Sequence, residues 1–256
     1  MLKGFPKTEL IVALDFNSVD AAEDVIAALE GLPVIYKIGL ELFLAAGPEW
    51  IKLLTQSGER VFLDLKFHDI PSTVGQAVLQ AANLQAEYLS IHLTGGNAML
   101  DEVHMRLIEI AALKENQKPP LVMGISILSS FAEDDWNATM QKLSTSKEVK
   151  PIEESVLAFA ALAHHHPSIN GLICSPHELY DIHSRHPDLF LMVAGIRPKG
   201  SFRHDQQWIM TPTDAKQNGA SAIIVGRPIT QAENCREMAI SILEELSQTS
   251  SEKKTA

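Results

Sequence analysis

Eight short apolar runs recur along the chain, separated by longer stretches in which apolar residues repeat at helical spacing. The runs are rich in β-branched residues and are too short for helices, so they predict buried parallel strands. They occupy Leu10–Leu14, Val34–Ile38, Val61–Leu65, Tyr88–Leu93, Leu121–Ile125, Gly171–Cys174, Phe190–Val193 and Ala222–Val225.

The stretches between these runs predict helices. Ser18 is suited to cap a helix that runs through Leu29, with apolar residues on one stripe and Gly31 after its end. Further helices are predicted at Pro48–Gln56, Thr73–Gln85, Ala98–Asn116, Glu153–His164, Pro176–His186, Thr213–Asn218 and Gln231–Leu246. Strands and helices that alternate in this way predict an α/β protein, a (β/α)8 TIM barrel. A doubly wound open sheet is the alternative, but no Gly-rich dinucleotide fingerprint follows the first strand.

No linker rich in Pro, Gly or Ser divides the 256 residues, so we expect a single TIM-barrel domain over 1–256. Its last part, about 247–256, reads as a polar tail. The connection 126–150 is long and predicts an extra short helix, for which the residues indicate no role.

The net charge of −11 argues against a nonspecific nucleic-acid binder, which needs a basic surface. No window approaches the roughly 18 apolar residues of a membrane span, and the N-terminal residues do not resemble a signal peptide. Cys174 and Cys235 lack the spacing of a zinc site and indicate no disulfide framework. We therefore expect a cytoplasmic protein without nucleic-acid or membrane partners.

In a TIM barrel, reacting groups lie at the carboxyl ends of the strands and in the loops that follow. Polar residues gather at these ends, whereas the opposite ends of the predicted strands show no comparable set. The residues at the carboxyl ends are Asp15, Lys37, Asp64, Lys66, His92, Ser126, Ser129, Arg197 and Arg227. Each of them alone could be structural, but together they predict a catalytic site on one rim.

Asp64 and Lys66 are two residues apart on a predicted strand, so their side chains point to the same face. Such a pair by itself is often a structural salt bridge. Because flanking carboxylates raise the pKa of an ammonium group, we expect Lys66 to stay protonated. A protonated lysine is suited to general acid catalysis, whereas a Schiff-base lysine must lose its proton.

Gly226 and Arg227 directly follow the last predicted strand. The loops after strands seven and eight of such barrels commonly bind phosphate, and Arg can hold phosphate oxygens in a fork. The alternative is a turn with a solvated Arg. A long polar loop after the seventh strand, from Gly195 through Gln207, predicts a lid over the same place.

The string Asp64-x-Lys66-x-x-Asp69-Ile70-Pro71-x-Thr73 resembles the signature of the orotidine 5′-phosphate decarboxylase family. The resemblance continues in order along nearly the whole chain, from Asp15 to Thr230. It includes Leu14-Asp15-Phe16, Lys37-Ile38-Gly39, Ile127-Leu128-Ser129-Ser130, Gly195-Ile196-Arg197-Pro198 and Gly226-Arg227-Pro228-Ile229-Thr230.

This resemblance implies an enzyme that converts orotidine 5′-monophosphate to uridine 5′-monophosphate and CO2 in pyrimidine biosynthesis. Lys66 would protonate C6 of the pyrimidine, Lys37 would fix the charge array, and Asp64 would lie beside the substrate carboxylate. The nucleotide would further contact Asp15, Ser129, Arg197, Gln206, Gly226 and Arg227. In the family, the residues matching Asp69 and Thr73 reach into the neighbouring subunit's site, which implies a homodimer with shared active sites. No metal and no cofactor is implied.

Three alternatives remain open. Some barrel relatives that act on sugar phosphates share the D-x-K-x-x-D motif but use magnesium, which carboxylates bind well. A barrel that binds a nucleotide without chemistry is a second alternative, although the set Lys37, Asp64, Lys66 and Asp69 is complete. A Schiff-base aldolase is the third.

Overall fold

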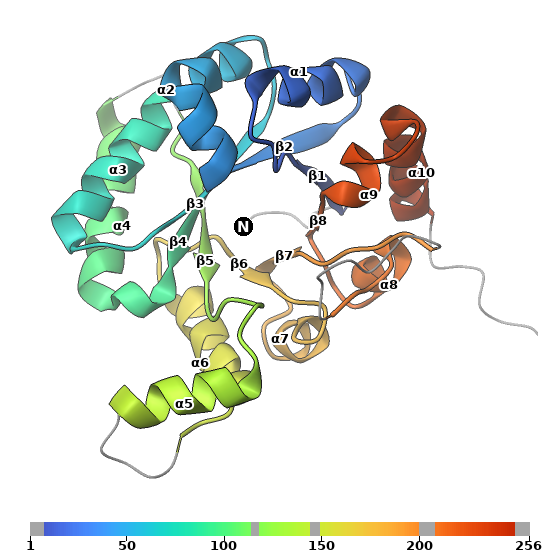
Figure 1. Cartoon of the computed structure of the whole chain (residues 1–256). Helices are drawn as coiled ribbons and strands as arrows, with labels where there is room; N and C mark the ends of the chain where they lie inside the picture. The colour runs from blue at the N-terminus through green and yellow to red at the C-terminus, as the bar shows by residue number, and fades with distance from the viewer. Residues whose placement is uncertain (1–7, 114–117, 144–148, 200–207, 249–256) are drawn as a thin grey trace, which may run out of the picture.

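All eight predicted strands are present, each within two residues of its expected bounds. The computed structural model describes residues 8–113, 118–143, 149–199 and 208–248. Neighbouring strands pair in parallel in chain order, and the last returns to the first, so the sheet closes into a barrel surrounded by helices (Figure 1). This confirms the predicted TIM barrel. The strands are β1 (Glu9–Ala13), β2 (Val34–Gly39), β3 (Val61–Phe67), β4 (Tyr88–His92), β5 (Leu121–Ile125), β6 (Gly171–Cys174), β7 (Phe190–Val193) and β8 (Ala222–Val225).

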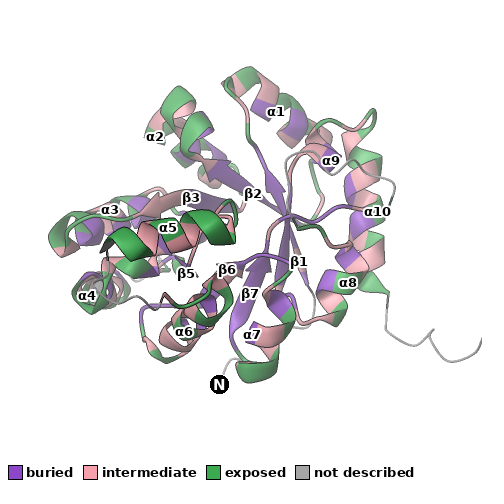
Figure 2. Ribbon diagram, turned by 60° about the horizontal axis from the view of Figure 1, so that its bottom comes forward, coloured by how far each residue is buried: buried purple, intermediate pink, exposed green. Residues whose placement is uncertain are grey.

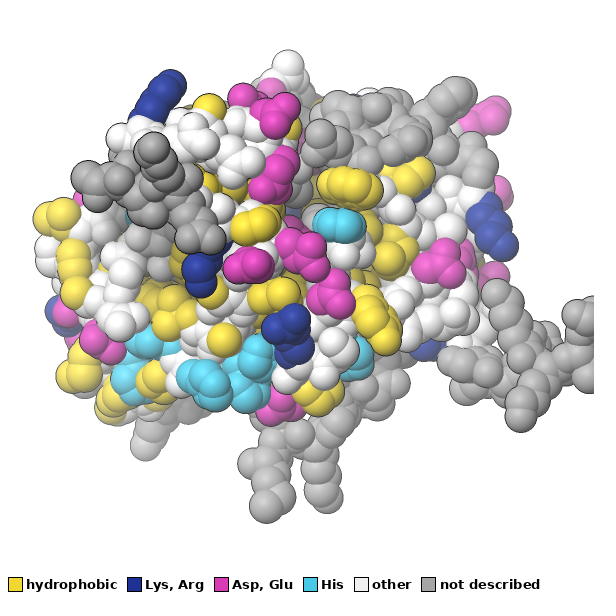
Figure 3. All heavy atoms as spheres, turned by 90° about the horizontal axis from the view of Figure 1, so that it is seen from below, with side chains coloured by type: hydrophobic (Ala, Val, Ile, Leu, Met, Phe, Trp, Pro, Cys, Tyr) yellow, Lys and Arg dark blue, Asp and Glu magenta, His cyan; other side chains and the backbone are white. Residues whose placement is uncertain are grey.

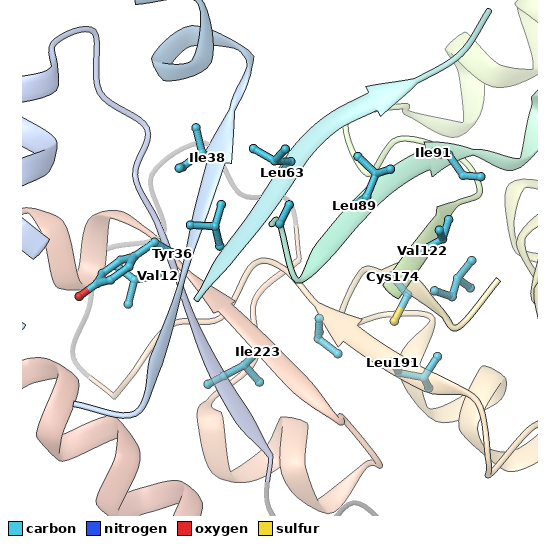
Figure 4. Close-up of a cluster of buried hydrophobic side chains, with 14 of the residues drawn as sticks. Val12, Tyr36, Ile38, Leu63, Leu89, Ile91, Val122, Cys174, Leu191 and Ile223 are labelled. Atoms are coloured by element: carbon cyan, nitrogen blue, oxygen red, sulfur yellow. The ribbon is translucent and has the colours of Figure 1, made fainter. Parts of the chain in front are cut away.

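Successive residues of each strand supply two separate apolar layers. One layer packs between the strands and the surrounding helices, and Figure 4 shows part of it, with Val12, Ile38 and Leu63 on neighbouring strands. The other layer fills the barrel interior, where the rings of Phe62 and Phe190 lie 6.2 and 6.0 Å from that of Tyr88. Each large apolar side chain buried in this way contributes about 1.5–3 kcal/mol.

The helices turn buried faces toward the sheet and exposed faces outward (Figure 2). Ser18 caps the first helix as predicted, because its hydroxyl group accepts a hydrogen bond from the Ala21 N–H at 3.4 Å. The helices are α1 (Val19–Ala28), α2 (Leu40–Gln56), α3 (Pro71–Asn83), the 3-10 turn η1 (Leu93–Gly95), α4 (Asn97–Leu113), α5 (Glu133–Leu143), α6 (Ile152–His165), α7 (Leu179–Arg185), α8 (Pro212–Gln217), α9 (Arg227–Thr230) and α10 (Cys235–Ser247).

Helix α2 begins earlier than the sequence predicts. The pair Gly47-Pro48 looks like a helix start, but α2 begins at Leu40 and bends at Gly47, where φ is 74°. Glycine adopts this backbone conformation readily and Pro48 fits the first turn after the bend, so one kinked helix replaces a loop and a helix. Helix α5 confirms the extra helix expected in 126–150, whereas the four-residue α9 was not predicted.

The prediction of no comparable polar set at the other ends of the strands is wrong. Arg60 precedes β3, and its Nη2 lies 2.7 Å from Glu9 Oε1 and 2.6 Å from Glu87 Oε1. The Tyr88 hydroxyl group donates to Glu9 Oε2 at 2.7 Å. In the sequence each member looks like an isolated charge beside a strand. Only the closed sheet brings them together.

Histidine side chains gather along one edge of the face that carries α5, α6 and α7 (Figure 3). At the end of α6, the His164 ring lies 4.7 Å from that of His186, and its Nε2 lies 3.0 Å from Asp188 Oδ1. Within the described residues, no three or more His, Cys, Asp or Glu side chains are arranged to hold a metal ion. None of the helices described is long and apolar enough to cross a membrane.

Candidate active site

A cavity of about 250 Å³ lies at the carboxyl ends of the strands. Space remains at this end because Ala13 on β1 and Ala194 after β7 have small side chains. At the other end, aromatic rings fill the barrel interior. Its wall includes most of the predicted site residues, namely Asp15, Lys37, Asp64, Lys66, Ser129, Arg197, Gly226 and Arg227. The structure therefore brings together residues that are up to two hundred positions apart in the chain.

Four of these residues form a row of charges that alternate in sign. Lys37 Nζ lies 3.0 Å from Asp15 Oδ1 and 3.5 Å from Asp64 Oδ2. Lys66 Nζ then donates to Asp64 Oδ1 at 2.8 Å. The side chains of Lys37 and Asp64 are 11% and 10% exposed, whereas Asp15 and Lys66 are 65% and 35% exposed. The row is thus buried in its middle and open to the cavity at its two ends.

Asp64 is held as a carboxylate in this row. Burial is the largest single effect and raises the pKa of its carboxyl group. The ammonium groups of Lys37 and Lys66, and the hydrogen bonds from Lys66 and Ser90, lower this pKa, and together they outweigh burial. The net effect keeps the pKa of Asp64 below its usual value. A fixed negative charge therefore stands beside the Lys66 ammonium group.

Lys66 reaches Asp64 with a backbone that differs from the predicted extended strand. Its φ is +51°, in the left-handed region that non-glycine residues seldom adopt, and the register of β3 against β4 shifts between Leu63 and Phe67. Backbone strain of this kind is common at functional sites, where the surrounding structure holds it in place. The contact was predicted correctly, but simple alternation along a strand does not produce it.

Arg197 and Arg227 give the wall at β7 and β8 a positive character. Gly195, with φ of 77°, turns the chain after β7, and the Arg197 N–H then donates to the Met210 carbonyl group at 2.9 Å. Arg197 is only 6% exposed, and its burial and then the nearby Arg227 guanidinium group lower its pKa. Two like charges at one cavity wall favour an anionic ligand.

Among the described residues, four predicted ones do not line the cavity, namely His92 and Ser126 of the predicted rim, and Asp69 and Thr73 of the family motif. Asp69 and Thr73 are exposed, and the Asp69 carboxylate accepts a hydrogen bond from the Ile70 N–H at 2.6 Å. Gln206 and most of the predicted lid lie outside the described residues.

The cavity also has members that the sequence reasoning missed. Ser175 directly follows β6, so the rule that sites lie at carboxyl ends of strands could have found it. Cys174 is buried in the apolar layer and also lines the cavity. Ser90, on β4, does not line the cavity itself but donates to Asp64, and it had no signal in the sequence, because a single serine in a strand suggests no chemistry.

The chain is similar over most of its length to proteins of one kind. A family model described as the orotidine 5′-phosphate decarboxylase / HUMPS family matches residues 8–242. Orotidine 5′-phosphate decarboxylase of Moorella thermoacetica is 37% identical over 91% of this chain and 89% of its own length. That of Idiomarina loihiensis is also 37% identical, over 88% of this chain and 91% of its own.

The solved structures agree with this similarity. A crystal structure of orotidine 5′-phosphate decarboxylase from Lactobacillus acidophilus matches with a TM-score of 0.80 and 33% identity. The match covers 94% of this chain and 100% of that one. On the strength of the family model and these relatives, the chain belongs to the orotidine 5′-phosphate decarboxylase family.

Proposed function

We propose that this protein is a carboxy-lyase that converts orotidine 5′-monophosphate to uridine 5′-monophosphate and CO2 in pyrimidine biosynthesis. The observation that carries the proposal is the row Asp15, Lys37, Asp64 and Lys66 in one cavity wall, in a cavity that also has two arginines. The substrate has matching chemistry, since it carries a phosphate group, a ribose with two hydroxyl groups and a carboxylate on the base.

Lys66 acts as the proton donor. The bond between C6 and the carboxylate carbon breaks, CO2 leaves, and the electron pair stays on C6. A proton from the Lys66 ammonium group then forms the new C6–H bond, and the neutral amine regains a proton from water. The Asp64 carboxylate supports this step by holding Lys66 Nζ at 2.8 Å. A donor fixed before the reaction avoids the entropic cost of orientation at the moment of transfer.

The rest of the nucleotide binds around this centre. Arg197 and Arg227 hold the phosphate oxygens, together with the backbone N–H of Gly226. Asp15 and Lys37 bind the ribose hydroxyl groups, and Ser129 recognises the pyrimidine. Gln206 joins the phosphate end, as the family resemblance implies.

The active enzyme is a homodimer in which each subunit completes the partner's site. Asp69 and Thr73 are exposed on their own subunit, next to Ile70, which is 64% exposed. Leu40, 56% exposed, also follows a strand on the same rim. Exposed apolar side chains beside polar ones that do not line the cavity of their own subunit are typical of an interface. We also place the enzyme in the cytoplasm, since both cysteines are free thiols.

The activity is tested by following the absorbance of orotidine 5′-monophosphate in buffer with EDTA. The parent should convert it rapidly, and Lys66→Ala should lower kcat by about a hundredfold or more. Lys52→Ala, which removes an exposed lysine on α2, is the matched control and should behave like the parent. Comparable turnover by Lys66→Ala would refute the role of Lys66. No conversion by a folded, dimeric parent would point to the metal-dependent sugar-phosphate relatives, whose activity is tested next with magnesium restored.

Shared sites are tested by mixing two inactive variants, Lys66→Ala and Asp69→Ala. A mixed dimer has one site with Lys66 from one subunit and Asp69 from the other. Free exchange of subunits should therefore restore about a quarter of the parent's activity. A mixture that exchanges subunits but stays inactive would contradict the shared site.

A further inference from the structure

The Ser90 hydroxyl group joins the two most important groups of the charged row. Ser90 lies on β4 and is completely buried. Its Oγ donates to Asp64 Oδ1 at 2.9 Å and accepts from the backbone N–H of Lys66, also at 2.9 Å. One side chain thus fixes both the carboxylate that holds the Lys66 ammonium group and the backbone from which Lys66 extends.

The second of these hydrogen bonds lies where β3 departs from regular pairing. Leu63 pairs with Leu89, and the next paired residues are Phe67 and Ile91, so the register shifts across the segment that contains Lys66. With φ at +51°, the Lys66 N–H bonds to a side chain, the Ser90 hydroxyl group. A strained residue keeps its conformation only when neighbouring groups hold it, and here Ser90 supplies that contact.

We propose that Ser90 is a positioning residue for the decarboxylation, because its hydroxyl group holds the Lys66 backbone and the Asp64 carboxylate in the arrangement that directs Lys66 Nζ into the cavity. This inference rests on the proposed role of Lys66 as proton donor. Ser90 itself does not line the cavity, so it acts through Lys66 and Asp64.

Loss of the hydroxyl group has an electrostatic effect that general loosening of the core would not have. The Ser90 hydrogen bond favours the ionised form of Asp64, after the larger effects of Lys37 and Lys66. Without it, the pKa of Asp64 rises. The other charged groups that face Asp64 or its partners stay in place, namely Lys37 from β2, Lys66 from β3, His92 from β4 and Asp15 after β1. As the pH falls, activity that needs ionised Asp64 is then lost at a higher pH than in the parent.

The test uses Ser90→Ala, which removes a single buried oxygen atom. Ser168→Ala is the matched control, because Ser168 is also completely buried, its hydroxyl group makes a hydrogen bond of 2.9 Å with the His166 ring, and it does not line the cavity. Both variants are checked for folding by circular dichroism. Their kcat and KM for orotidine 5′-monophosphate and the pH profile of kcat/KM are then compared with those of the parent and of Lys66→Ala.

We expect Ser90→Ala to lower kcat about tenfold or more with a smaller change in KM, as the loss of a hydrogen bond to a charged group does. The acid limb of its pH profile should move to higher pH, and Ser168→Ala should change neither kcat nor the acid limb. An unchanged kcat, or a reduced kcat with an unmoved acid limb, would overturn the inference, and so would an equal loss of kcat in Ser168→Ala. The proposed role of Lys66 as proton donor is refuted by a different result, namely turnover by Lys66→Ala equal to that of the parent.

Discussion

The two ends of the barrel each carry a network of charged side chains on neighbouring strands. At the amino ends, Arg60 bridges Glu9 and Glu87 with N–O distances of 2.7 and 2.6 Å. At the carboxyl ends, Lys37 bridges Asp15 and Asp64 at 3.0 and 3.5 Å. Short contacts and alternating charges are therefore present at both ends, and neither property distinguishes the site.

The filling of the barrel interior makes the difference. Beside the Arg60 network, the rings of Phe62, Tyr88 and Phe190 occupy the interior. None of Glu9, Arg60 and Glu87 lines the active-site cavity. At the other end Ala13 and Ala194 leave space, and Lys66 faces it. A charged network thus becomes a candidate for catalysis when it borders a cavity, and otherwise contributes to stability.

The largest effect should follow from Asp64→Asn, which keeps the shape of the side chain and removes its charge. Lys66 would lose the anion that holds it, so kcat should fall by about a hundredfold or more. The measurement is steady-state turnover of orotidine 5′-monophosphate. A folded variant with the parent's kcat would show that the network at the carboxyl ends is structural too.

Arg227→Ala should act on binding more than on turnover. If the positive wall at β7 and β8 binds the phosphate group as proposed, loss of this guanidinium group should raise KM about tenfold to a hundredfold. Calorimetric titration with uridine 5′-monophosphate should show a matching loss of affinity. Arg236→Ala is the control, because the hydrogen bonds that Arg236 makes with the described residues go only to the Ala28 and Glu30 carbonyl groups on the surface. Equal losses in the two variants would contradict a specific phosphate site.

Arg60→Met should lower stability and leave turnover unchanged. It keeps an apolar stem and removes the bridge between Glu9 and Glu87. The free energy of unfolding should fall by about 1–3 kcal/mol, less than for a fully buried pair because the Arg60 side chain is 39% exposed. Urea unfolding measures this change, and kcat should stay at the parent's value. Reduced turnover with unchanged stability would reverse the assignment of the two ends.

Tyr88→Phe should have the smallest effect. It keeps the ring contacts and removes the hydrogen bond to Glu9, so unfolding should need about 0.5–1.5 kcal/mol less. Burial, and then the hydrogen bond to Glu9, raise the pKa of Tyr88. The contribution of Tyr88 is therefore present below the ordinary tyrosine pKa of about 10 and is lost as the pH rises toward the folded value.

Urea unfolding of the parent and of Tyr88→Phe at neutral and alkaline pH checks this sign. The difference in stability should narrow at alkaline pH, because only the parent loses the contribution of the neutral phenol. A difference that grows with pH would mean that the phenol is not held neutral in the folded protein.

The sequence was sufficient for the strands and for the rim on which the site lies. Apolar runs of this length leave few alternatives to buried strands. In a TIM barrel, functional groups lie at the carboxyl ends of the strands, and this rule places Asp15, Lys37 and Arg227 at one end. Ser90 and the left-handed backbone of Lys66 could not be foreseen, because both depend on how β3 and β4 pair. The Arg60 network was missed for a related reason, since its charges meet only when the barrel is closed.

Strand β1 gains one of its two neighbours only after nearly the whole chain has been made. Leu10 pairs with Val34 on one side and with Ile223 of β8 on the other. On the ribosome, β1 therefore carries an open edge through most of translation, which is a hazard for aggregation. The same late segment brings Gly226 and Arg227. Completion of the barrel and completion of the cavity wall at β8 are thus one event, so a nascent chain has no finished cavity before the barrel has closed.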